Sequence, residues 1–278
     1  MSTAVVPTLV IEPSRRFPRL GLRELWAYRG LFWFLVWRDV KVRYAQTVLG
    51  AAWAVLQPVL TMAIFAVIFG AFARIPSDGA PYPLFALAAL VPWTFFATAL
   101  TGASTSLTAN TGLITKVYFP RLVIPFAPLL AGLLDFAIGL GVLGLAMIVY
   151  GVAPSPAVFV VLPVVLLAML LTLAGAGCWL AALNIEYRDV KFVVPFLVQV
   201  WMYASPVIYP ASVVPARYRG LYALNPMVGV IEGFRAALLG TGTVPWPALA
   251  ISVVVGAVLF ASGALYFRRT ERVFADVA

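Results

Sequence analysis

Residues 136–185 read FAIGLGVLGLAMIVYGVAPSPAVFVVLPVVLLAMLLTLAGAGCWLAALNI and contain no charged side chain. A membrane helix needs about 20 mainly apolar residues to cross about 30 Å of hydrocarbon, so this stretch is long enough for two crossings. The segment Gly151-Val-Ala-Pro-Ser-Pro156 interrupts it with residues that favour a turn. The sequence therefore predicts two membrane helices, at 124–150 and 157–183.

Four further apolar intervals predict four more crossings. The whole chain is 63% hydrophobic and only 10% charged, whereas soluble domains are about 45–50% apolar and about 25% charged. Helices are expected because backbone polar groups in lipid must be satisfied within the segment, and the alternating ten-residue strands of a β-barrel are missing. The predicted fold class is an all-α integral membrane protein with six transmembrane helices, the other four at 48–73, 82–107, 192–208 and 247–267.

The distribution of Lys and Arg predicts the orientation. Fifteen of these residues fall in the N-terminal segment, the 107–124 and 184–191 loops and the C-terminal tail, and four fall in the opposite set of connections. Because positive charge is retained in the cytoplasm, both termini are expected there, with residues 1–21 and 268–278 as cytoplasmic tails. The formal charge of +9 is thereby explained as a topology signal and a preference for anionic membrane lipid rather than for nucleic acid.

An additional helix is expected before the first span, at 22–44. Its centre, Leu31-Phe-Trp-Phe-Leu-Val-Trp37, is apolar all round but only seven residues long, and Arg29 and Arg38 flank it. Such a segment is too short to cross a bilayer and suits the interface plane. The prediction is a cytoplasmic interfacial helix; a simple membrane anchor is the alternative.

A second additional helix is expected outside the membrane, before the last span. Asn225 can cap it, Pro226 suits its first position and Gly240 suits its end. One face is apolar, and Glu232 and Arg235 are spaced to pair on the other. The interpretation is a short amphipathic helix that dips into the outer leaflet; an ordinary surface loop is the alternative.

Several kinds of chemistry are excluded by what the sequence lacks. It has no histidine, a single cysteine (Cys178) and no GxxxxGK[ST] phosphate loop. These absences remove His-based triads and zinc sites, internal disulfides and known ways of hydrolysing ATP unaided. No metal site and no cofactor bound by this chain are expected.

Asp135 is an acidic residue within a predicted span. A lone carboxylate there is costly, so it is expected to face protein or water. One interpretation is a proton or substrate site. The favoured one is structural, with the carboxyl satisfied by hydroxyls or backbone, because no second buried charge in a span could continue a proton relay.

Aromatic residues make up 14% of the chain. Those within the spans allow two interpretations: a tunnel whose rings stack on the apolar faces of sugars, or packing and lipid contact. The candidate channel residues are Trp53, Trp93, Phe95, Phe96, Phe136, Trp201 and Tyr203.

A set of motifs, in order along nearly the whole chain after about residue 20, resembles the permease subunit of bacterial polysaccharide ABC exporters. It includes Arg38-Asp-Val-Lys-Val-Arg-Tyr44, Pro92-Trp-Thr-Phe-Phe96, Lys116-Val-Tyr-Phe-Pro-Arg121, Ser205-Pro-Val-Ile-Tyr-Pro210 and Asn225-Pro-Met227. The tetrapeptide Arg-Asp-Val-Lys occurs twice, at 38–41 and 188–191, each time on the cytoplasmic side of a span.

The resemblance implies a homodimer in the bacterial cytoplasmic (inner) membrane, with two copies of a separate ATP-binding subunit that carries ATP and Mg. The implied substrate is a lipid-linked O antigen, capsular polysaccharide or teichoic acid. Residues expected to couple the permease to the ATPase are Arg38, Asp39, Lys41, Lys116, Tyr118, Phe119, Arg121, Arg188 and Asp189. An external gate is expected at Pro206, Tyr209, Asn225, Pro226, Glu232 and Arg235.

Three other functions stay open from the sequence. They are a permease for a small lipid or drug, a proton-coupled flippase that uses Asp135, and a membrane glycosyltransferase. The last fits least well, because the ten acidic residues are scattered and mostly lie next to basic ones.

Overall fold

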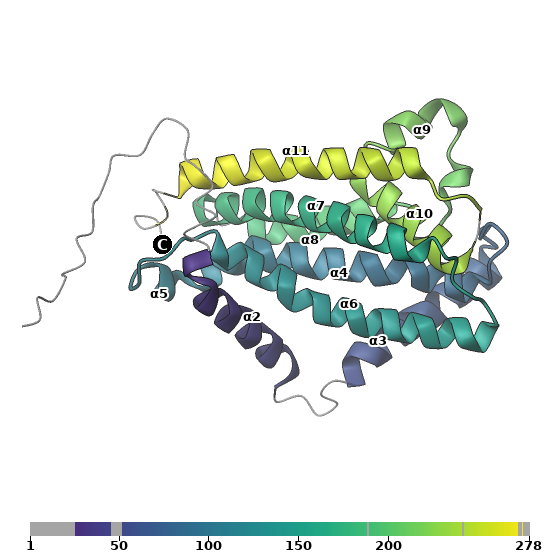
Figure 1. Cartoon of the computed structure of the whole chain (residues 1–278), viewed down its shortest axis with the longest axis horizontal. Helices are drawn as coiled ribbons and strands as arrows, with labels where there is room; N and C mark the ends of the chain where they lie inside the picture. Colours follow the sequence, from purple (N-terminus) through teal and green to yellow (C-terminus); the bar gives the residue numbers. More distant parts are fainter. Residues whose placement is uncertain (1–25, 46–51, 188, 241, 272–273, 275–278) are drawn as a thin grey trace, which may run out of the picture.

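Helices make up the regular structure of the residues that the computed structural model describes, namely 26–45, 52–187, 189–240, 242–271 and 274. The all-helical prediction is confirmed over these residues. Five segments are long and apolar enough to cross a membrane, and they run along the long axis of the molecule (Figure 1). They are Ala52–Phe72, Tyr82–Ala109, Val123–Tyr150, Val158–Glu186 and Trp246–Thr270.

Helix α4 (Tyr82–Ala109) forms the centre of the core. Within its most apolar stretch, 78% of the residues are buried inside the chain. It packs against α6 (Val123–Tyr150), α7 (Val158–Glu186) and the external helix α10 (Pro226–Leu239). The chain itself therefore shields most of α4 from lipid.

Glycines bring α7 and α11 (Trp246–Thr270) into close contact. A Cβ atom on Gly263 would lie 2.2 Å from the carbonyl oxygen of Gly175, and a Cβ on Gly175 would lie 2.3 Å from the carbonyl carbon of Leu259. Small residues allow this backbone approach, which favours helix association in membranes. Beside the contact, Trp179 stacks on Tyr266 with ring centroids 4.1 Å apart.

In contrast, α3 (Ala52–Phe65) lies at the periphery. It continues into a π-helix, η1 (Ala66–Phe72), and neither element contains a buried residue. The connection to α4 includes Arg74 and Asp78, both with positive φ angles, of 52° and 49°. Most of α3 is thus available to lipid or to another chain.

The predicted span at 192–208 differs from the helix observed. Helix α8 runs from Val190 to Tyr203 and has 14 residues, which gives a length of about 21 Å. Residues 204–208 form turns, because Pro206 interrupts the backbone there. Alone, α8 is shorter than the hydrocarbon layer.

The first described helix, α2 (Arg29–Tyr44), agrees with the helix expected at 22–44, of which residues 22–25 lie outside the described part. It runs obliquely across the first half of α6 (Figure 1). Leu35 and Val36 are buried in a cluster with α6 residues, whereas Trp33 and Trp37 are 65% and 58% exposed. One face thus contacts the bundle and the other offers aromatic rings to the surroundings.

The external connection contains η2 (Ala211–Val213), α9 (Ala216–Tyr222) and α10. The sequence correctly predicts that α10 begins with Pro226 and ends at Gly240, whose φ angle is +65°. Protein rather than lipid covers its apolar residues. Met227, Val230 and Ile231 have 0% exposure, because α4, α7 and α11 cover the helix. The depth of this helix in the outer leaflet stays a prediction.

Candidate functional site

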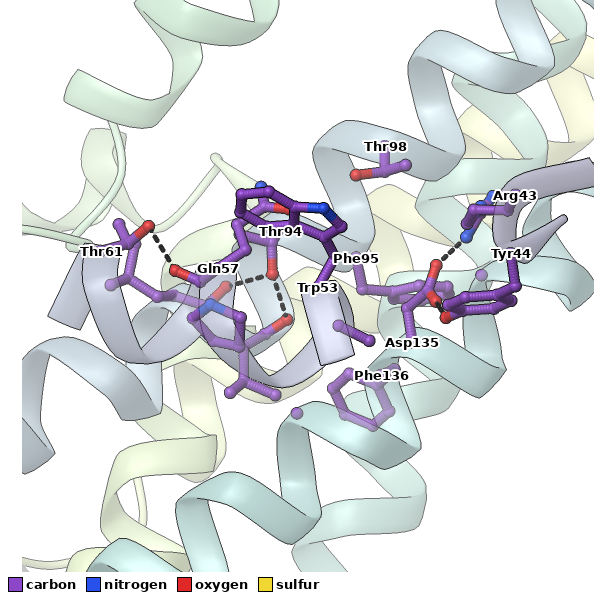
Figure 2. Close-up of a pocket in the computed structure, with 16 residues that line it drawn as sticks. Arg43, Tyr44, Trp53, Gln57, Thr61, Thr94, Phe95, Thr98, Asp135 and Phe136 are labelled. Atoms are coloured by element: carbon purple, nitrogen blue, oxygen red, sulfur yellow. Dashed lines mark hydrogen bonds and ion pairs between the residues drawn. The ribbon is translucent and has the colours of Figure 1, made fainter. Parts of the chain in front are cut away.

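A cavity of about 200 Å³ lies between the start of α3, the middle of α4 and the middle of α6. Figure 2 shows side chains from these helices and from the end of α2 around it. Its lining combines apolar side chains with hydroxyl, amide and charged groups. The polar members are Arg43, Tyr44, Gln57, Thr61, Thr94, Thr98 and Asp135.

An ion pair closes one side of this cavity. Arg43 pairs with the Asp135 carboxylate, and the Tyr44 hydroxyl donates a hydrogen bond to the same group (Figure 2). Asp135 lies about 18 Å along α6 from Val123, at about 1.5 Å per residue. The structure therefore favours the structural interpretation of Asp135, but with charged and phenolic partners from α2. Sequence reasoning missed Arg43 because it was counted among the cytoplasmic charges.

Polar residues at helical spacing line the opposite sides of the cavity. Trp53, Gln57 and Thr61 are four residues apart along α3, and Thr94 and Thr98 are one turn apart on α4. Of these, only Trp53 was predicted as a site residue. The spacing on α3 was the available signal, because Gln57 and Thr61 interrupt an otherwise apolar helix.

The predicted channel residues separate into two groups. Trp93, Phe95, Phe96 and Phe136 belong to the core of the single chain, with exposures of 4% or less. They form a series of ring contacts that includes Phe96 edge-on to Trp201, with centroids 4.9 Å apart. In this conformation Trp93 and Phe96 are enclosed by the chain, whereas Phe95 and Phe136, although nearly buried, line the cavity.

The remaining candidates are more accessible. Trp53 is 48% exposed and Tyr203 is 54% exposed. Trp201 is partly buried, and its indole N–H donates to the Asn225 side-chain oxygen at 2.8 Å. Trp53 and Tyr203 are therefore the predicted channel residues with the largest free surface.

At the end of the bundle that the sequence predicts to be cytoplasmic, α2 is attached to the end of α4. Arg38 pairs with Asp39 at 2.8 Å and donates to the Asn110 side-chain oxygen at 2.7 Å. Asn110 in turn donates to the Ser106 carbonyl, four residues earlier in α4. Lys41 is exposed. Arg38 thus joins two elements of this chain, and Asn110 is the partner that the sequence did not reveal.

The loop between α5 (Thr111–Ile114) and α6 presents its predicted residues in different ways. Tyr118 is 85% exposed and Lys116 is also exposed. Phe119 is only 4% exposed and belongs to a buried cluster with Phe267 and Phe274. The sequence grouped Tyr118 with Phe119 as residues for insertion into the ATPase, but Phe119 is occupied by its own chain.

The C-terminal end of α11 fixes this loop. The backbone N–H of Arg121 donates to the Glu271 carboxylate at 3.1 Å, and its guanidinium bonds the Glu271 carbonyl. Arg268 also pairs with Glu271 at 3.3 Å. Of the other predicted pair, Asp189 is exposed at the start of α8, and Arg188 lies outside the described residues.

At the end of the bundle that the sequence predicts to face outward, Arg235 is 2% exposed and joins three segments. It donates to the carbonyls of Phe85, Pro206 and Val207 at 3.2, 2.6 and 2.8 Å, and pairs with Glu232 at 3.2 Å. Its guanidinium also lies 3.5 Å from the centre of the Phe85 ring. The broken end of α8 is thereby bound to α4 and α10.

Asn225 makes a second connection at this end. Its oxygen accepts from the Met227 backbone N–H at 3.1 Å, as predicted for a helix cap, and its amide donates to the Ala204 carbonyl at 2.9 Å. The Tyr209 hydroxyl donates to the Tyr203 carbonyl at 2.8 Å. The six predicted external residues therefore gather around the end of α8, with Pro226 starting α10.

Burial changes the ionisation of the external pair. It raises the pKa of Glu232 above its usual 4.5, against the opposing effect of Arg235 and of a hydrogen bond from the Ala211 N–H. Burial also lowers the pKa of Arg235 to about 10, although Glu232 acts in the opposite direction. Both shifts arise because charged groups lose solvation in the interior.

Comparison with known proteins assigns the family. The profile of the ABC-2 type transporters matches residues 30–239, which run from the start of α2 to the end of α10. The chain belongs to the ABC-2 type transporter family. It is thus the membrane permease component of an ABC transporter and a multi-pass membrane protein.

Individual relatives of this ABC-2 permease cover most of its length. It is 32% identical over 256 residues to the O-antigen export system permease protein RfbA of Myxococcus xanthus, covering 90% of this chain and 96% of the relative. It is 28% identical over 240 residues to RfbA of Klebsiella pneumoniae, covering 86% and 92%. It is 26% identical over 206 residues to the polysialic acid transport protein KpsM of Escherichia coli, covering 73% and 78%.

Proposed function

We propose that this chain is the permease of an exporter that moves a lipid-linked polysaccharide, such as an O antigen or a capsular polysaccharide, across the cytoplasmic membrane. The observation that carries the proposal is the similarity to the Myxococcus O-antigen permease, which extends over 96% of that protein. The chain lacks a phosphate loop for ATP, so a separate ATP-binding subunit is required to supply the energy.

The position of the chain ends supports an even number of crossings. Tyr28 and Leu31, near the start of α2, pack against a cluster that contains Phe267 and Phe274 from the end of the chain. We infer that α8, together with the turn that follows it, completes a sixth crossing beside the five long segments. Together with the distribution of Lys and Arg, this arrangement supports a cytoplasmic position for both ends.

Exposed helix faces support a second copy of the chain. Neither α3 nor η1 has a buried residue, and Phe192, Phe196 and Tyr203 on α8 are 54–70% exposed. One subunit does not supply enough protein surface to enclose a path wide enough for a sugar chain. We therefore propose a symmetric dimer bound to two ATP-binding subunits, in which these faces meet each other, the path or lipid.

A proton-coupled flippase is less well supported. Its candidate residue, Asp135, is ion-paired to Arg43 and accepts a hydrogen bond from Tyr44. These contacts favour a structural role for Asp135 in an exporter driven by a partner.

The decisive experiment is genetic and chemical. Deleting the gene should remove the polysaccharide from the cell surface while its lipid-linked form accumulates inside, where an added glycosidase reaches it only after permeabilisation. A plasmid copy should restore export, and a copy of the same gene truncated before Trp246 should not. Normal surface glycan in the deletion strain, with a different lipid retained inside, would overturn the proposal.

A further inference from the structure

We propose that the cavity between α3, α4 and α6 binds one neutral sugar ring of the exported glycan. This inference rests on the proposed export function and identifies a site for its substrate. It begins with accessible polar side chains in an apolar setting. Gln57 and Thr98 both line the cavity and are exposed, so the Gln57 amide and the Thr98 hydroxyl are accessible to a ligand there.

The position of these groups on apolar helices points to a polar occupant. Gln57 lies on Ala52–Phe72, a segment with a mean hydropathy of 2.2 in its most apolar part. Polar side chains at membrane depth are costly unless they contact water, protein or a ligand. A polar cavity of this size is wide enough for water, so a hydroxylated ligand can replace water molecules without losing their hydrogen bonds.

The charges of the cavity favour a neutral ligand over an anion. The one arginine in the lining, Arg43, is already paired with Asp135. The Thr94 hydroxyl donates its proton to the Leu90 carbonyl at 2.7 Å, which leaves its oxygen free to accept. Sugar hydroxyls donate to such acceptors, whereas a phosphate at neutral pH mainly requires donors.

An aromatic ring beside these polar groups completes the match to a sugar. Trp53 is about half exposed and lies with Gln57 and Thr94 at the cavity (Figure 2). Amphipathic sugar rings place their C–H face on an aromatic side chain while their hydroxyls bond polar neighbours. The volume of about 200 Å³ is below the roughly 300–1,000 Å³ of sites for drug-sized molecules, which fits a single ring rather than a chain.

The test uses the complete permease with its ATP-binding partner in nanodiscs. Saturation-transfer NMR would be recorded with maltose and the methyl glycosides of mannose, galactose and N-acetylglucosamine. We expect transfer to at least one of these neutral sugars. Two further compounds are added as competitors. Glucose 1-phosphate tests for an anionic ligand, and glycerophosphoglycerol represents a lipid headgroup that also carries hydroxyls.

Matched variants connect the signal to the cavity. Gln57→Leu and the double variant Thr94→Val/Thr98→Val should weaken transfer by about fivefold or more, as loss of a hydrogen bond to a neutral ligand predicts. Thr101→Val should leave the saturation transfer unchanged, because Thr101 does not line the cavity. It is a matched control, since it lies one turn further along α4 and its hydroxyl donates a similar hydrogen bond to the Ala97 carbonyl at 2.8 Å.

Each contrary result has a distinct meaning. The cavity proposal is overturned if none of the four sugars gives transfer, if the cavity variants bind like the wild type, or if glycerophosphoglycerol or glucose 1-phosphate displaces the sugar. Export is measured separately in cells. Loss of sugar binding with normal glycan export would remove the cavity from the path while leaving the proposed function standing, and failed export in the wild-type complex would count against the proposed function alone.

Discussion

Arg43, near the end of α2, is ion-paired with Asp135, in the middle of α6. Since the two side chains are 30% and 28% exposed, the pair is neither fully solvated nor fully buried. It connects α2 to the core at the edge of the cavity that is also lined by Trp53 and Gln57. Charge balance within the membrane region therefore depends on the position of α2.

Neutralising one partner alone should destabilise the permease. Asp135→Asn keeps the size of the side chain but leaves Arg43 without its counter-ion, and Arg43→Gln has the converse effect. We expect either change to lower the free energy of unfolding by about 1–2 kcal/mol, a value between those for exposed and for buried pairs. The double variant Arg43→Gln/Asp135→Asn should recover most of it. Thermal unfolding of the purified protein in detergent measures all four forms, and strictly additive losses would contradict a direct coupling.

Adjacent residues in the cytoplasmic loop should give different phenotypes. Tyr118→Ala removes an exposed ring, so the amount of folded protein should stay the same. We expect ATP hydrolysis to continue in this variant without matching export. Phe119→Ala removes a buried ring and should cost about 3–5 kcal/mol of stability. Purified complexes in lipid would be assayed for ATPase rate and export, corrected for folded permease. Normal coupling in Tyr118→Ala would exclude this side chain from energy transmission.

The glycine contact between α7 and α11 predicts a severe effect of a small change. Gly263→Ala places a methyl group against the Gly175 carbonyl, so we expect the helices to separate at a cost of about 1–3 kcal/mol. Gly144→Ala on α6 is the matched control, since nothing lies within 4 Å of its added atom. Fluorescence-detected gel filtration after heating compares the two; equal melting temperatures would show that α11 accommodates the methyl group.

Burial of Glu232 predicts a pH effect at the outer end. Its folded-state pKa is raised above 4.5, so the folded form binds more protons than the unfolded form between these two values. The contribution of this group is therefore most favourable below pH 4.5 and is lost as the pH rises through the raised pKa. Glu232→Gln should flatten this part of the stability profile.

The profile would be measured by thermal unfolding between pH 4 and 8. Asp189→Asn, which removes an exposed carboxylate at the opposite end of α8, serves as the control. The quantity to compare is the difference in unfolding temperature between the wild type and Glu232→Gln. If this difference stays constant over the pH range, burial does not determine the ionisation of Glu232.

The sequence predicted local features well because they depend on nearby residues. The caps of α10 at Asn225 and Gly240 need only a short stretch of chain, and so do the turn between 150 and 157 and the apolar lengths of the five long segments. It failed where the answer depends on what covers a face. Lipid and protein interior are equally apolar, so nothing in α10 itself indicates that protein rather than lipid covers its apolar side.

The same limitation applies at the site. Trp93 and Phe96 look like channel residues because aromatic rings suit sugars, yet in this conformation they fill the core. Phe119 follows Tyr118 directly but points into a cluster built from residues at the end of the chain. Asp135 finds its partners about 90 positions earlier in the sequence, a distance at which spacing carries no information. In each case the deciding contact is remote in sequence.

The close contact of α7 with α11 has a consequence for how the protein is made. Helix α11, which covers Gly175, is synthesised after α7, so α7 enters the membrane with its tightest binding face still empty. Helix α3, by contrast, contains no buried residue and can insert on hydropathy alone. We expect the nascent permease to remain loosely assembled until Trp246–Thr270 has been synthesised, which makes insertion of α11 a step at which quality control can distinguish assembled from unassembled subunits.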